Sequence, residues 1–464
     1  MTFRLADLGK IYFCTGARNH DLLNIFSADK LAFEFDERMA SFKALGHAKC
    51  LEAPVAVCTT SGTAVSECVS ALLEAKYSAV PLVLISGDRP KKMHGTGAPQ
   101  TIEHEPLTTA ARGSYIEIPL SELKDLVIEN PVYPIHINVL VDDTKPHDQP
   151  LKFAKDIEAF RQFLAKVKRP LFLFSHESKS MRSFILKFSN TNLPFYAETM
   201  SGGHDLSTIR TEKKLIELFR NKTFDSVIRI GHTPLSKVWR LLEVDPLPVF
   251  SFDERGLPGM SFGEVLKTGT TALTESFWNS LDDVKFPFEG DGSFETLINL
   301  LQKYPDSEPA VMKKVHDFLP YDARVYLGNS LIVRFFELIQ TKRFRIEGNR
   351  GVNGIDGQLA TAIGMASTTK ENVYCILGDI TTRYDLSSLL ELPSNLRLII
   401  INNRGGRIFD LLKLDKRIVL EHDKDFSQLI PAMGLTYGET LKDYQVTELK
   451  PSREETDQFL QEWL

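Results

Sequence analysis

The chain has 464 residues, of which 43% are hydrophobic and 25% are charged, so its composition is that of an ordinary folded globular protein. This length exceeds what one hydrophobic core usually serves, and we expect roughly two to four domains. A formal net charge of −6 gives no electrostatic reason to expect binding to nucleic acid or to an anionic membrane.

The cysteines and the N-terminal residues indicate a cytoplasmic protein. Five cysteines are scattered along the chain without a CxxC pair, which favours buried free thiols in a reducing compartment over zinc or disulfide chemistry. The N-terminus, "MTFRLADLGKIYFCTG", lacks a basic region followed by a long apolar core. Because no run approaches about 18 apolar residues, we expect no integral membrane segment.

Short apolar runs typical of β-strands alternate with helical patterns in the first third of the chain. Such alternation predicts a parallel sheet with crossover helices. The polar, proline-bearing residues 144–150 indicate a linker, so we end a first domain at residue 148. The predicted strands lie at 10–16, 31–35, 53–60, 80–87 and 134–141.

Two further series of apolar runs predict two further α/β domains, over 149–310 and 311–464. A polar stretch at 289–309 separates them, and nearly every strand of the third series ends in Gly, Asn or Asp. Strand ends of this kind are where open α/β sheets bind ligands. The predicted strands lie at 169–176, 193–200, 224–232 and 247–254, and then at 323–330, 342–351, 372–379 and 396–406.

The sharpest local signal lies in the third domain, where one strand ends at Gly378-Asp379 and the next at Asn402-Asn403. A hard cation such as Mg²⁺ takes only a few oxygen ligands from protein, so one carboxylate, one amide oxygen and one backbone carbonyl would suffice. Glycines after the second strand and in "NRGVNGIDG" would let backbone amides approach a phosphate. Glycine-rich turns joining strands to helices are the alternative interpretation. The spacing resembles the metal and diphosphate signature of thiamine diphosphate enzymes.

Such an enzyme supplies a carboxylate to the pyrimidine ring of the cofactor, which favours the imino tautomer that serves as base. The tetrapeptide FDER occurs at 35–38 and at 252–255, each time after a strand-like run. Glu37 is followed by apolar residues at helical spacing, so it should open a helix. Glu254 is followed by "GLPG", a turn sequence. We therefore assign the cofactor role to Glu37 and expect Glu254 to be a solvated turn residue.

Nine segments together resemble one family, the thiamine diphosphate-dependent 2-succinyl-5-enolpyruvyl-6-hydroxy-3-cyclohexene-1-carboxylate (SEPHCHC) synthases of menaquinone biosynthesis. The middle domain matches this family weakly. In the family's order, the segments are "FDERMASFKALGHAK", "TTSGTAVSE", "VPLVLISGDRP", "GTGAPQTI", "PIHINVLVDD", "GNSLIVR", "GNRGVNGIDGQLATAIG", "GDITTRYDLSSL" and "NNRGGRIF".

The resemblance implies three doubly wound parallel-sheet domains, called pyrimidine-binding, central and diphosphate-binding. It implies a transferase with thiamine diphosphate and Mg²⁺ or Mn²⁺ as cofactors. The implied reaction is decarboxylation of 2-oxoglutarate and addition of the resulting succinic semialdehyde carbanion equivalent to isochorismate. The cofactor does the difficult electronic work, and the protein holds two polyanionic substrates. The implied assembly is a homodimer or homotetramer with active sites at the subunit interface, so that Glu37 and Asp379 of one site come from different chains.

The resemblance also implies roles for individual residues. Guanidinium groups suit substrate carboxylates because they bind them bidentately. We expect Glu37, Gln100, Arg18 and Ser330 to be catalytic. Cofactor contacts are expected at Glu37, Ser61, Thr63, Gly351, Asn353, Gly354, Ile355, Gly378, Gly406 and Ile408. Substrate contacts are expected at Arg18, Arg89, Gln100, Lys237, Arg334, Arg350 and Phe409. The expected metal ligands are Asp379, Asn403 and the carbonyl of Gly405.

Alternatives remain open for single residues and for the whole chain. Each arginine alone could be a surface ion-pair partner, and Ser61 could cap a helix. In "GHTPLSKVWRLL" only Lys237 stands where the family has a basic pair, because Val238 follows. The chain is also shorter than is usual for the family. A different thiamine diphosphate-dependent decarboxylase or carboligase is therefore a second hypothesis, and a non-catalytic paralogue is a third.

Overall fold

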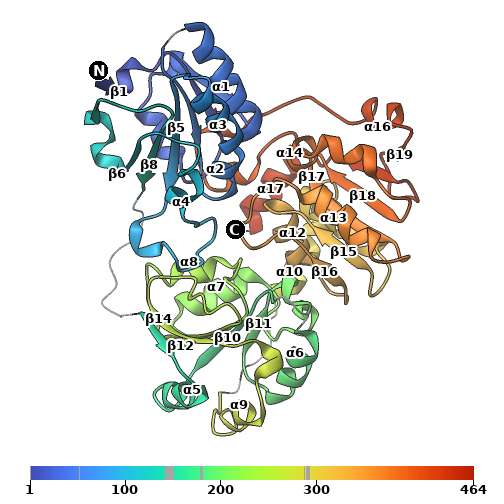
Figure 1. Ribbon diagram of the computed structural model, residues 1–464. Helices are drawn as coiled ribbons and strands as arrows, with labels where there is room; N and C mark the ends of the chain where they lie inside the picture. Colours follow the sequence, from blue (N-terminus) through green and yellow to red (C-terminus); the bar gives the residue numbers. More distant parts are fainter. Residues whose placement is uncertain are drawn as a thin grey trace. The chain divides into compact units, whose positions relative to one another are not determined.

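The computed structural model describes residues 2–51, 53–141, 151–177, 181–286, 288 and 293–463 (Figure 1). The chain divides into two compact units, each formed by segments distant in sequence. Unit 1 comprises Met1–Asp143, Gly351–Asp356 and Arg404–Lys424, and unit 2 comprises Thr144–Arg350, Gly357–Asn403 and Asp425–Leu464. The predicted linker at 144–150 lies outside the described residues, as does the predicted boundary after residue 148.

Unit 1 contains a six-stranded, wholly parallel sheet. Its spatial order is β3 (Leu31–Glu34), β2 (Ile11–Cys14), β4 (Val55–Thr59), β5 (Leu82–Asp88), β8 (Ile135–Leu140) and β6 (Tyr115–Pro119). A separate antiparallel pair joins β1 (Thr2–Arg4) to β7 (Val127–Glu129).

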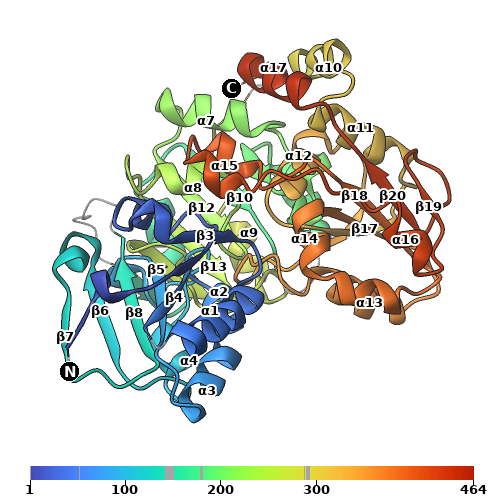
Figure 2. The ribbon, with the colours of Figure 1, turned by 90° about the horizontal axis from the view of Figure 1, so that it is seen from above.

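Two apolar clusters cover the faces of this sheet. One packs the strands against α1 (Glu37–Leu51) and α3 (Val69–Tyr77), and Figure 2 shows these helices on the same side as α2 (Thr63–Glu67) and α4 (His104–Thr108). The other cluster includes Ile418, with Phe409 of α15 (Ile408–Leu411) packed against it. Residues 404–424 thus complete the core of unit 1, which explains why they belong to it.

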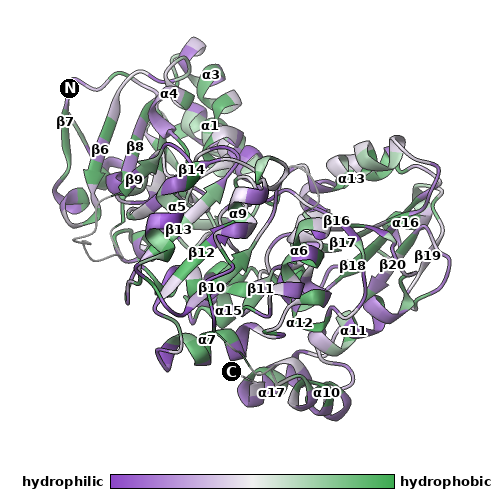
Figure 3. Cartoon of the chain, turned by 90° about the horizontal axis from the view of Figure 1, so that it is seen from below, coloured by the Kyte–Doolittle hydropathy of each residue, from purple (hydrophilic) through white to green (hydrophobic). Residues whose placement is uncertain are grey.

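Unit 2 contains two six-stranded sheets, both wholly parallel. The first has the order β11 (Phe195–Ala197), β10 (Pro170–Phe174), β12 (Ser226–Ile230), β13 (Val249–Asp253), β14 (Gly263–Lys267) and β9 (Leu151–Ala154). In Figure 3 the strands β10, β12 and β13 are largely in the green of apolar residues. Its helices are α5 (Ile157–Leu164), α6 (Arg182–Phe188), α7 (Glu212–Arg220), α8 (Lys237–Leu241) and α9 (Glu275–Asn279).

The second sheet of unit 2 has the order β16 (Arg345–Glu347), β15 (Arg324–Leu327), β17 (Val373–Gly378), β18 (Leu396–Ile401), β20 (Val446–Leu449) and β19 (Tyr437–Gly438). Its helices are α10 (Ser293–Lys303), α11 (Glu308–Phe318), α12 (Leu331–Ile339), α13 (Gln358–Ser367), α14 (Asp379–Tyr384), α16 (Leu429–Ala432) and α17 (Arg453–Trp463). The predicted boundary after residue 310 falls inside α11.

The three parallel sheets with their helices confirm the predicted α/β class. Each predicted strand is present. Continuous apolar runs form β4, β5, β10 and β13, which are buried along their whole length, whereas the edge strands β3 and β16 are only partly buried. No helix in the described part of the chain is both long and apolar enough to cross a bilayer.

Candidate active site

The first FDER segment places Glu37 at the start of α1, as predicted. The Asp36 carboxylate accepts a hydrogen bond from the Met39 amide at 2.7 Å, which is the bond of a helix N-cap. Glu37 is the first helical residue and is only 8% exposed. Burial, and then the charge of Glu37, raise the pKa of the Cys14 and Cys68 thiols. The carboxylate therefore faces the interior, beside the end of β2.

The second FDER segment is built differently. Asp253 is buried and accepts from the Arg255 amide at 2.8 Å. Glu254 Oε1 lies 2.8 Å from His232 Nε2, and Gly256 has a left-handed φ of 78° that turns the chain. The predicted turn is confirmed. The expectation of a solvated Glu254 is wrong in part, since its side chain is 28% exposed and paired with a histidine.

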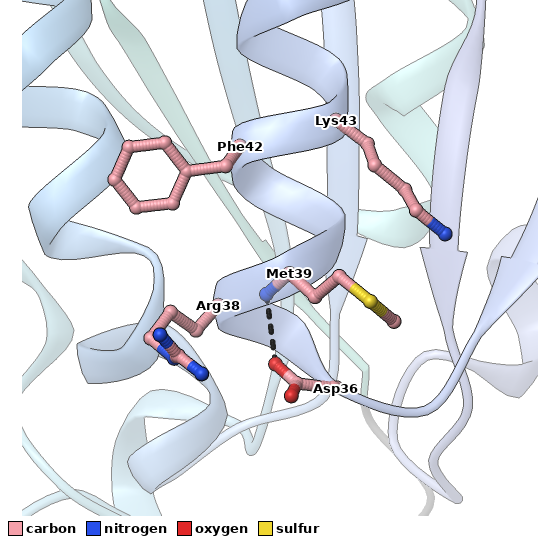
Figure 4. A pocket seen from close by; sticks show the side chains of 5 residues that line it. All are labelled: Asp36, Arg38, Met39, Phe42 and Lys43. Atoms are coloured by element: carbon pink, nitrogen blue, oxygen red, sulfur yellow. Dashed lines mark hydrogen bonds between the residues drawn. The ribbon is translucent and has the colours of Figure 1, made fainter.

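The outer face of α1 carries an open depression of about 430 Å³ lined by Asp36, Arg38, Met39, Phe42 and Lys43. Figure 4 shows Arg38 and Phe42 on one side of the helix and Met39 and Lys43 on the other. Met39 and Phe42 are 37% and 42% exposed. The apolar spacing predicted the helix correctly, but these two side chains do not enter the core of unit 1.

The "TTSGTA" turn joins β4 to α2. Gly62 occupies the N-cap position of α2 with φ 87°, and no side chain caps the helix there, so the alternative of capping by Ser61 is wrong. Ser61 is 1% exposed. Its Oγ is buried and has no hydrogen-bond partner among the described residues. A buried hydroxyl without a partner costs stability unless a ligand satisfies it.

The loop at 351–356 meets this turn within unit 1. The Thr63 hydroxyl donates to Asp356 Oδ1 at 2.7 Å. A side-chain carbon on Gly354 would lie 2.4 Å from the Thr63 hydroxyl oxygen, so only glycine allows the two segments to approach so closely. Asn353 Oδ1 is buried and likewise finds no partner in the described parts of the chain. Two segments almost 300 residues apart therefore form one polar surface.

Of three further predicted residues, Gln100 lies near the same turn, and Arg89 and Arg18 lie at the end of β5. Gln100 has φ 59°, and its Cα is 3.6 Å from where a Cβ of Gly62 would stand. Arg89 directly follows β5, is buried, and donates from Nε to the Pro99 carbonyl at 3.1 Å. The Arg18 carbonyl packs so closely on Gly87 that an added Cβ would come within 2.6 Å. The end of β5 is thereby fixed to the turn that carries Arg18.

The glycines after β18 form a tight turn in unit 1. Gly405 has φ 144°, and a Cβ there would lie 2.8 Å from the Val419 carbonyl. The Gly406 amide donates to the same carbonyl at 2.7 Å. Ile408 begins α15, and Phe409 packs on the apolar cluster of the first sheet. This turn leaves no room for a side chain at Gly405, and at Gly406 a Cβ would lie 3.1 Å from the Phe409 ring.

Three predicted residues of unit 2, Ser330, Arg334 and Arg350, follow the ends of β15 and β16. Ser330 has φ 65° and precedes α12, and its carbonyl accepts from Arg334 Nη1 at 2.6 Å. Arg350 Nη1 donates to Asn329 Oδ1. Burial lowers the pKa of Arg334 to about 10 and also lowers that of Arg350. Asn329 accepts from Arg350 and directly precedes Ser330, and it was not singled out from the sequence, although it stands inside "GNS".

Lys237 and Val238 start α8 and point to different environments. Lys237 is exposed, and its backbone amide donates to Glu212 Oε1. Val238 is fully buried in an apolar cluster of the middle sheet. A charged residue at Val238 would have to leave this cluster. The departure from the family's basic pair is therefore a core substitution.

The predicted metal ligands follow neighbouring strands, β17 and β18. Asp379 is the first residue of α14 and is 2% exposed, and a Cβ at Gly378 would meet nothing within 4 Å. Asn403 Nδ2 donates to Glu308 at 3.0 Å, so its Oδ1, the atom a hard cation prefers, is on the opposite side of the amide. Asn402 instead bonds to Glu448 at 2.6 Å in the interior. The described residues contain no cluster of three or more His, Cys, Asp or Glu side chains suited to a metal.

Comparison with known proteins identifies the family. Residues 4–107 match the thiamine pyrophosphate enzyme, N-terminal TPP binding domain. SEPHCHC synthase from Bdellovibrio bacteriovorus is 32% identical over 97% of this chain and 94% of its own length. The chain belongs to the SEPHCHC synthase family. The synthase from Akkermansia muciniphila is 30% identical over 96% of this chain and 94% of its own. One solved structure, from Mycobacterium smegmatis, aligns over 96% of both chains with 14% identity and a TM-score of 0.46, too distant to inform the function.

In this SEPHCHC synthase family member, the predicted site residues divide between the two units. Unit 1 gathers Arg18, Glu37, Ser61, Thr63, Arg89, Gln100, Gly351, Asn353, Gly354, Ile355, Gly405, Gly406, Ile408 and Phe409. Unit 2 gathers Lys237, Ser330, Arg334, Arg350, Gly378, Asp379 and Asn403.

The residues present suit thiamine diphosphate with a divalent cation. Ser61 Oγ and Asn353 Oδ1 are buried polar atoms that lack partners among the described residues, and both belong to predicted cofactor segments. Gly351 and Gly378 have open space where a Cβ would stand, so a ligand could approach their backbone closely. Asp379 and Asn403 offer the hard oxygen donors that Mg²⁺ requires.

Proposed function

We propose that the protein is a SEPHCHC synthase, which decarboxylates 2-oxoglutarate and adds the succinyl unit to isochorismate. The observation that carries this proposal is the meeting, in unit 1, of the "TTSGTA" turn with the loop at 351–356. The helix opened by Glu37, α1, contacts α2, which begins in that turn. Relatives carrying this name over nearly the whole chain support it.

We infer that Glu37 holds the pyrimidine ring of the cofactor, since a buried carboxylate at a helix start can hydrogen-bond a ring nitrogen. Ser61, Thr63, Asn353 and Ile355 would contact the rest of the ring system. When bound, thiamine diphosphate supplies the electron sink for decarboxylation. The protein's own part is to keep Glu37 out of water and to fix the turn and the loop around it.

The diphosphate would be held by backbone amides and by the metal. Gly351, Gly354, Gly378 and Ile408 lie in turns or at helix starts, where backbone amides can approach an anion. Gly406 would line the same site, and its own amide donates to the Val419 carbonyl. Asp379, Asn403 and the Gly405 carbonyl would bind Mg²⁺ or Mn²⁺.

The substrates carry several carboxylates, and the proposal gives their recognition to guanidinium and amide groups. Arg18, Arg89, Arg334 and Arg350 would bind carboxylates, with Lys237 at the edge of the site. Gln100 and Ser330 both have left-handed backbone, which projects their side chains from tight turns. Conformations of this kind cost energy and persist where the surroundings require them. Gln100 and Ser330 would orient substrate, and Phe409 would close the site.

We further propose a cytoplasmic homodimer, or a homotetramer built from it, whose subunits divide as 1–148, 149–310 and 311–464. Met39 and Phe42 are large apolar side chains exposed on α1, directly after Glu37, and Arg38 and Lys43 flank them. An exposed apolar surface with a charged rim is typical of a protein interface. We expect a partner subunit to pack on this face of α1.

The decisive test is a synthase assay with thiamine diphosphate, Mg²⁺, 2-oxoglutarate and isochorismate, read by mass spectrometry of the adduct. Glu37→Gln should remove most activity, whereas Glu254→Gln, the matched change in the other FDER segment, should leave it nearly intact. Absence of adduct together with turnover of another 2-oxo acid would overturn the substrate assignment in favour of a different decarboxylase. Equal losses in the two variants would contradict the role of Glu37.

A further inference from the structure

A buried histidine, His104, holds the turn that contains the proposed cofactor residues. The Gly62 amide donates to His104 Nε2 at 3.2 Å. Gly62 stands between Ser61 and Thr63, and His104 begins α4, four residues after Gln100. The side chain of His104 is fully buried. The turn at the end of β4 is therefore tied to the interior by one imidazole nitrogen.

The other nitrogen of this ring reaches one side chain from each of two neighbouring strands, β5 and β8. His104 Nδ1 lies 2.8 Å from Asn138 Oδ1 and 3.2 Å from Asp88 Oδ2. Asn138 Nδ2 donates to Asp88 at 3.0 Å, and the Arg89 amide donates to the other oxygen of Asp88 at 2.7 Å. The network thus runs from the backbone of Arg89 to the backbone of Gly62 without leaving the protein interior.

This geometry selects one form of the ring. A backbone amide can only donate, so Nε2 must be the acceptor and carry no hydrogen. Nδ1 then carries the hydrogen and donates toward Asn138 and Asp88. The Asp88 carboxylate fixes this tautomer in the same way that a carboxylate orients the imidazole of other active-site histidines. A protonated ring would point a hydrogen at the Gly62 amide and break the bond.

We propose that His104, fixed by Asp88 and Asn138, is a positioning residue for the cofactor turn. It acts through the Gly62 amide, which sets the left-handed backbone between Ser61 and Thr63. The same turn supports Gln100, whose Cα is close to Gly62. This inference rests on the proposed function, because the turn matters only if it binds cofactor or substrate.

Substitution of His104 by Gln or by Asn tests the two ring nitrogens separately. The His104→Gln side chain reaches as far as Nε2 and can accept from Gly62, whereas the His104→Asn side chain reaches only as far as Nδ1. His316 is a matched control, because it is also fully buried, accepts from the Thr341 amide through Nε2 at 3.2 Å, and faces Asp317 through Nδ1. His316 belongs to α11 in unit 2 and is not among the proposed site residues.

His104→Asn should bind thiamine diphosphate with Mg²⁺ about tenfold more weakly, the effect of losing one buried hydrogen bond, while His104→Gln should stay within about twofold of wild type. His316→Asn should lose comparable thermal stability and keep its cofactor affinity. Hydrogen exchange in a peptide covering 59–66 should be faster in His104→Asn alone. This readout needs no turnover, so it holds even if the wild-type protein makes no SEPHCHC and the proposed function fails.

Unchanged cofactor affinity and exchange in His104→Asn would overturn the inference, as would equal losses in His104→Asn and His104→Gln, which would indicate a merely structural histidine. If His104→Asn does not fold, His104→Gln decides. The positioning role is supported if His104→Gln binds the cofactor as tightly as wild type and exchanges slowly at 59–66. A tenfold loss of cofactor affinity in His104→Gln overturns it.

Discussion

Combining two inactive variants tests whether each active site takes residues from two chains. Glu37 lies in unit 1 and Asp379 in unit 2, so Glu37→Gln and Asp379→Ala each alter one unit and leave the other intact. In a two-fold dimer with shared sites, a mixed dimer has one site carrying both substitutions and one site carrying neither. Neither parent homodimer has a complete site.

The expected activity is set by the number of complete sites. The Glu37→Gln homodimer should retain at most about one hundredth of wild-type kcat, because loss of a general acid/base group costs ~10²-fold or more. The Asp379→Ala homodimer should be similarly inactive, because it loses a proposed ligand of the metal that holds the diphosphate. Mixed dimers purified through two different affinity tags should regain about half of the wild-type activity per dimer, and an unsorted equal mixture about a quarter. The KM values of the regained activity should equal those of wild type, since the active sites are unaltered.

Adduct formation by co-expressed, doubly purified dimers is the assay, with dimer mass checked by light scattering. Glu254→Gln, which changes a glutamate paired with His232, serves as the active control. Mixed dimers as inactive as their parents would refute shared sites. A site made within one chain would then be the alternative, and unit 1 gives it a basis, since residues 351–356 and 404–424 pack with 1–143 of the same chain.

Three further predictions concern the cofactor loop, a buried carboxylate and the metal. Gly354→Ala would place a carbon 2.2 Å from Asp356 Oδ1. The affinity for the cofactor, measured by calorimetry, should therefore fall about tenfold or more. Gly364→Ala is the control and should leave the affinity unchanged, because a Cβ there would meet nothing within 4 Å. Burial raises the pKa of Glu337. The free energy of unfolding should therefore fall as the pH rises from the ordinary glutamate pKa to the raised one. Thermal melts of Glu337→Gln should show no such pH-dependent decrease. Chelating the divalent cation should weaken cofactor binding in a fluorescence titration, Mn²⁺ should restore it, and Asp379→Asn should be insensitive to both.

Local sequence predicted the features that depend on local chemistry. Buried parallel strands need continuous apolar runs, so the runs located them. Glu37 and Glu254 were separated by the residues that come after them, a helical pattern in the first case and "GLPG" in the second. The strands β1, β6, β7, β9, β14, β19 and β20 were missed. Short strands at or next to a sheet edge carry mixed side chains and are stabilised by pairing with a neighbour that the local sequence does not name.

Other features were not predictable because they arise from contacts across the fold. Met39 and Phe42 fit a helical apolar pattern, yet alanines of α1 fill the space against the sheet and leave both exposed. The sequence shows Val238 where the family has a basic residue, but only the structure shows that this side chain is buried in the core. His104 accepts from an amide 42 residues away in the sequence, and the sequence alone does not show which residues so far apart come into contact. Each case is decided by tertiary packing, which overrides local propensity.

Under the proposed function, the buried arginines of unit 2 would explain how a protein of net charge −6 attracts polyanionic substrates. Burial lowers the pKa of Arg334 to about 10, so the guanidinium is still charged at neutral pH but poorly solvated. Burial raises the pKa of Glu198 and Glu337, the nearby carboxyls, which favours their neutral forms and leaves the charge of Arg334 and Arg350 incompletely balanced. A substrate carboxylate would supply the missing negative charge, and the stabilisation is larger in this interior than it would be at an exposed arginine. Arg334→Lys should therefore raise KM more than it lowers kcat, because the ammonium keeps the charge and loses the bidentate contact.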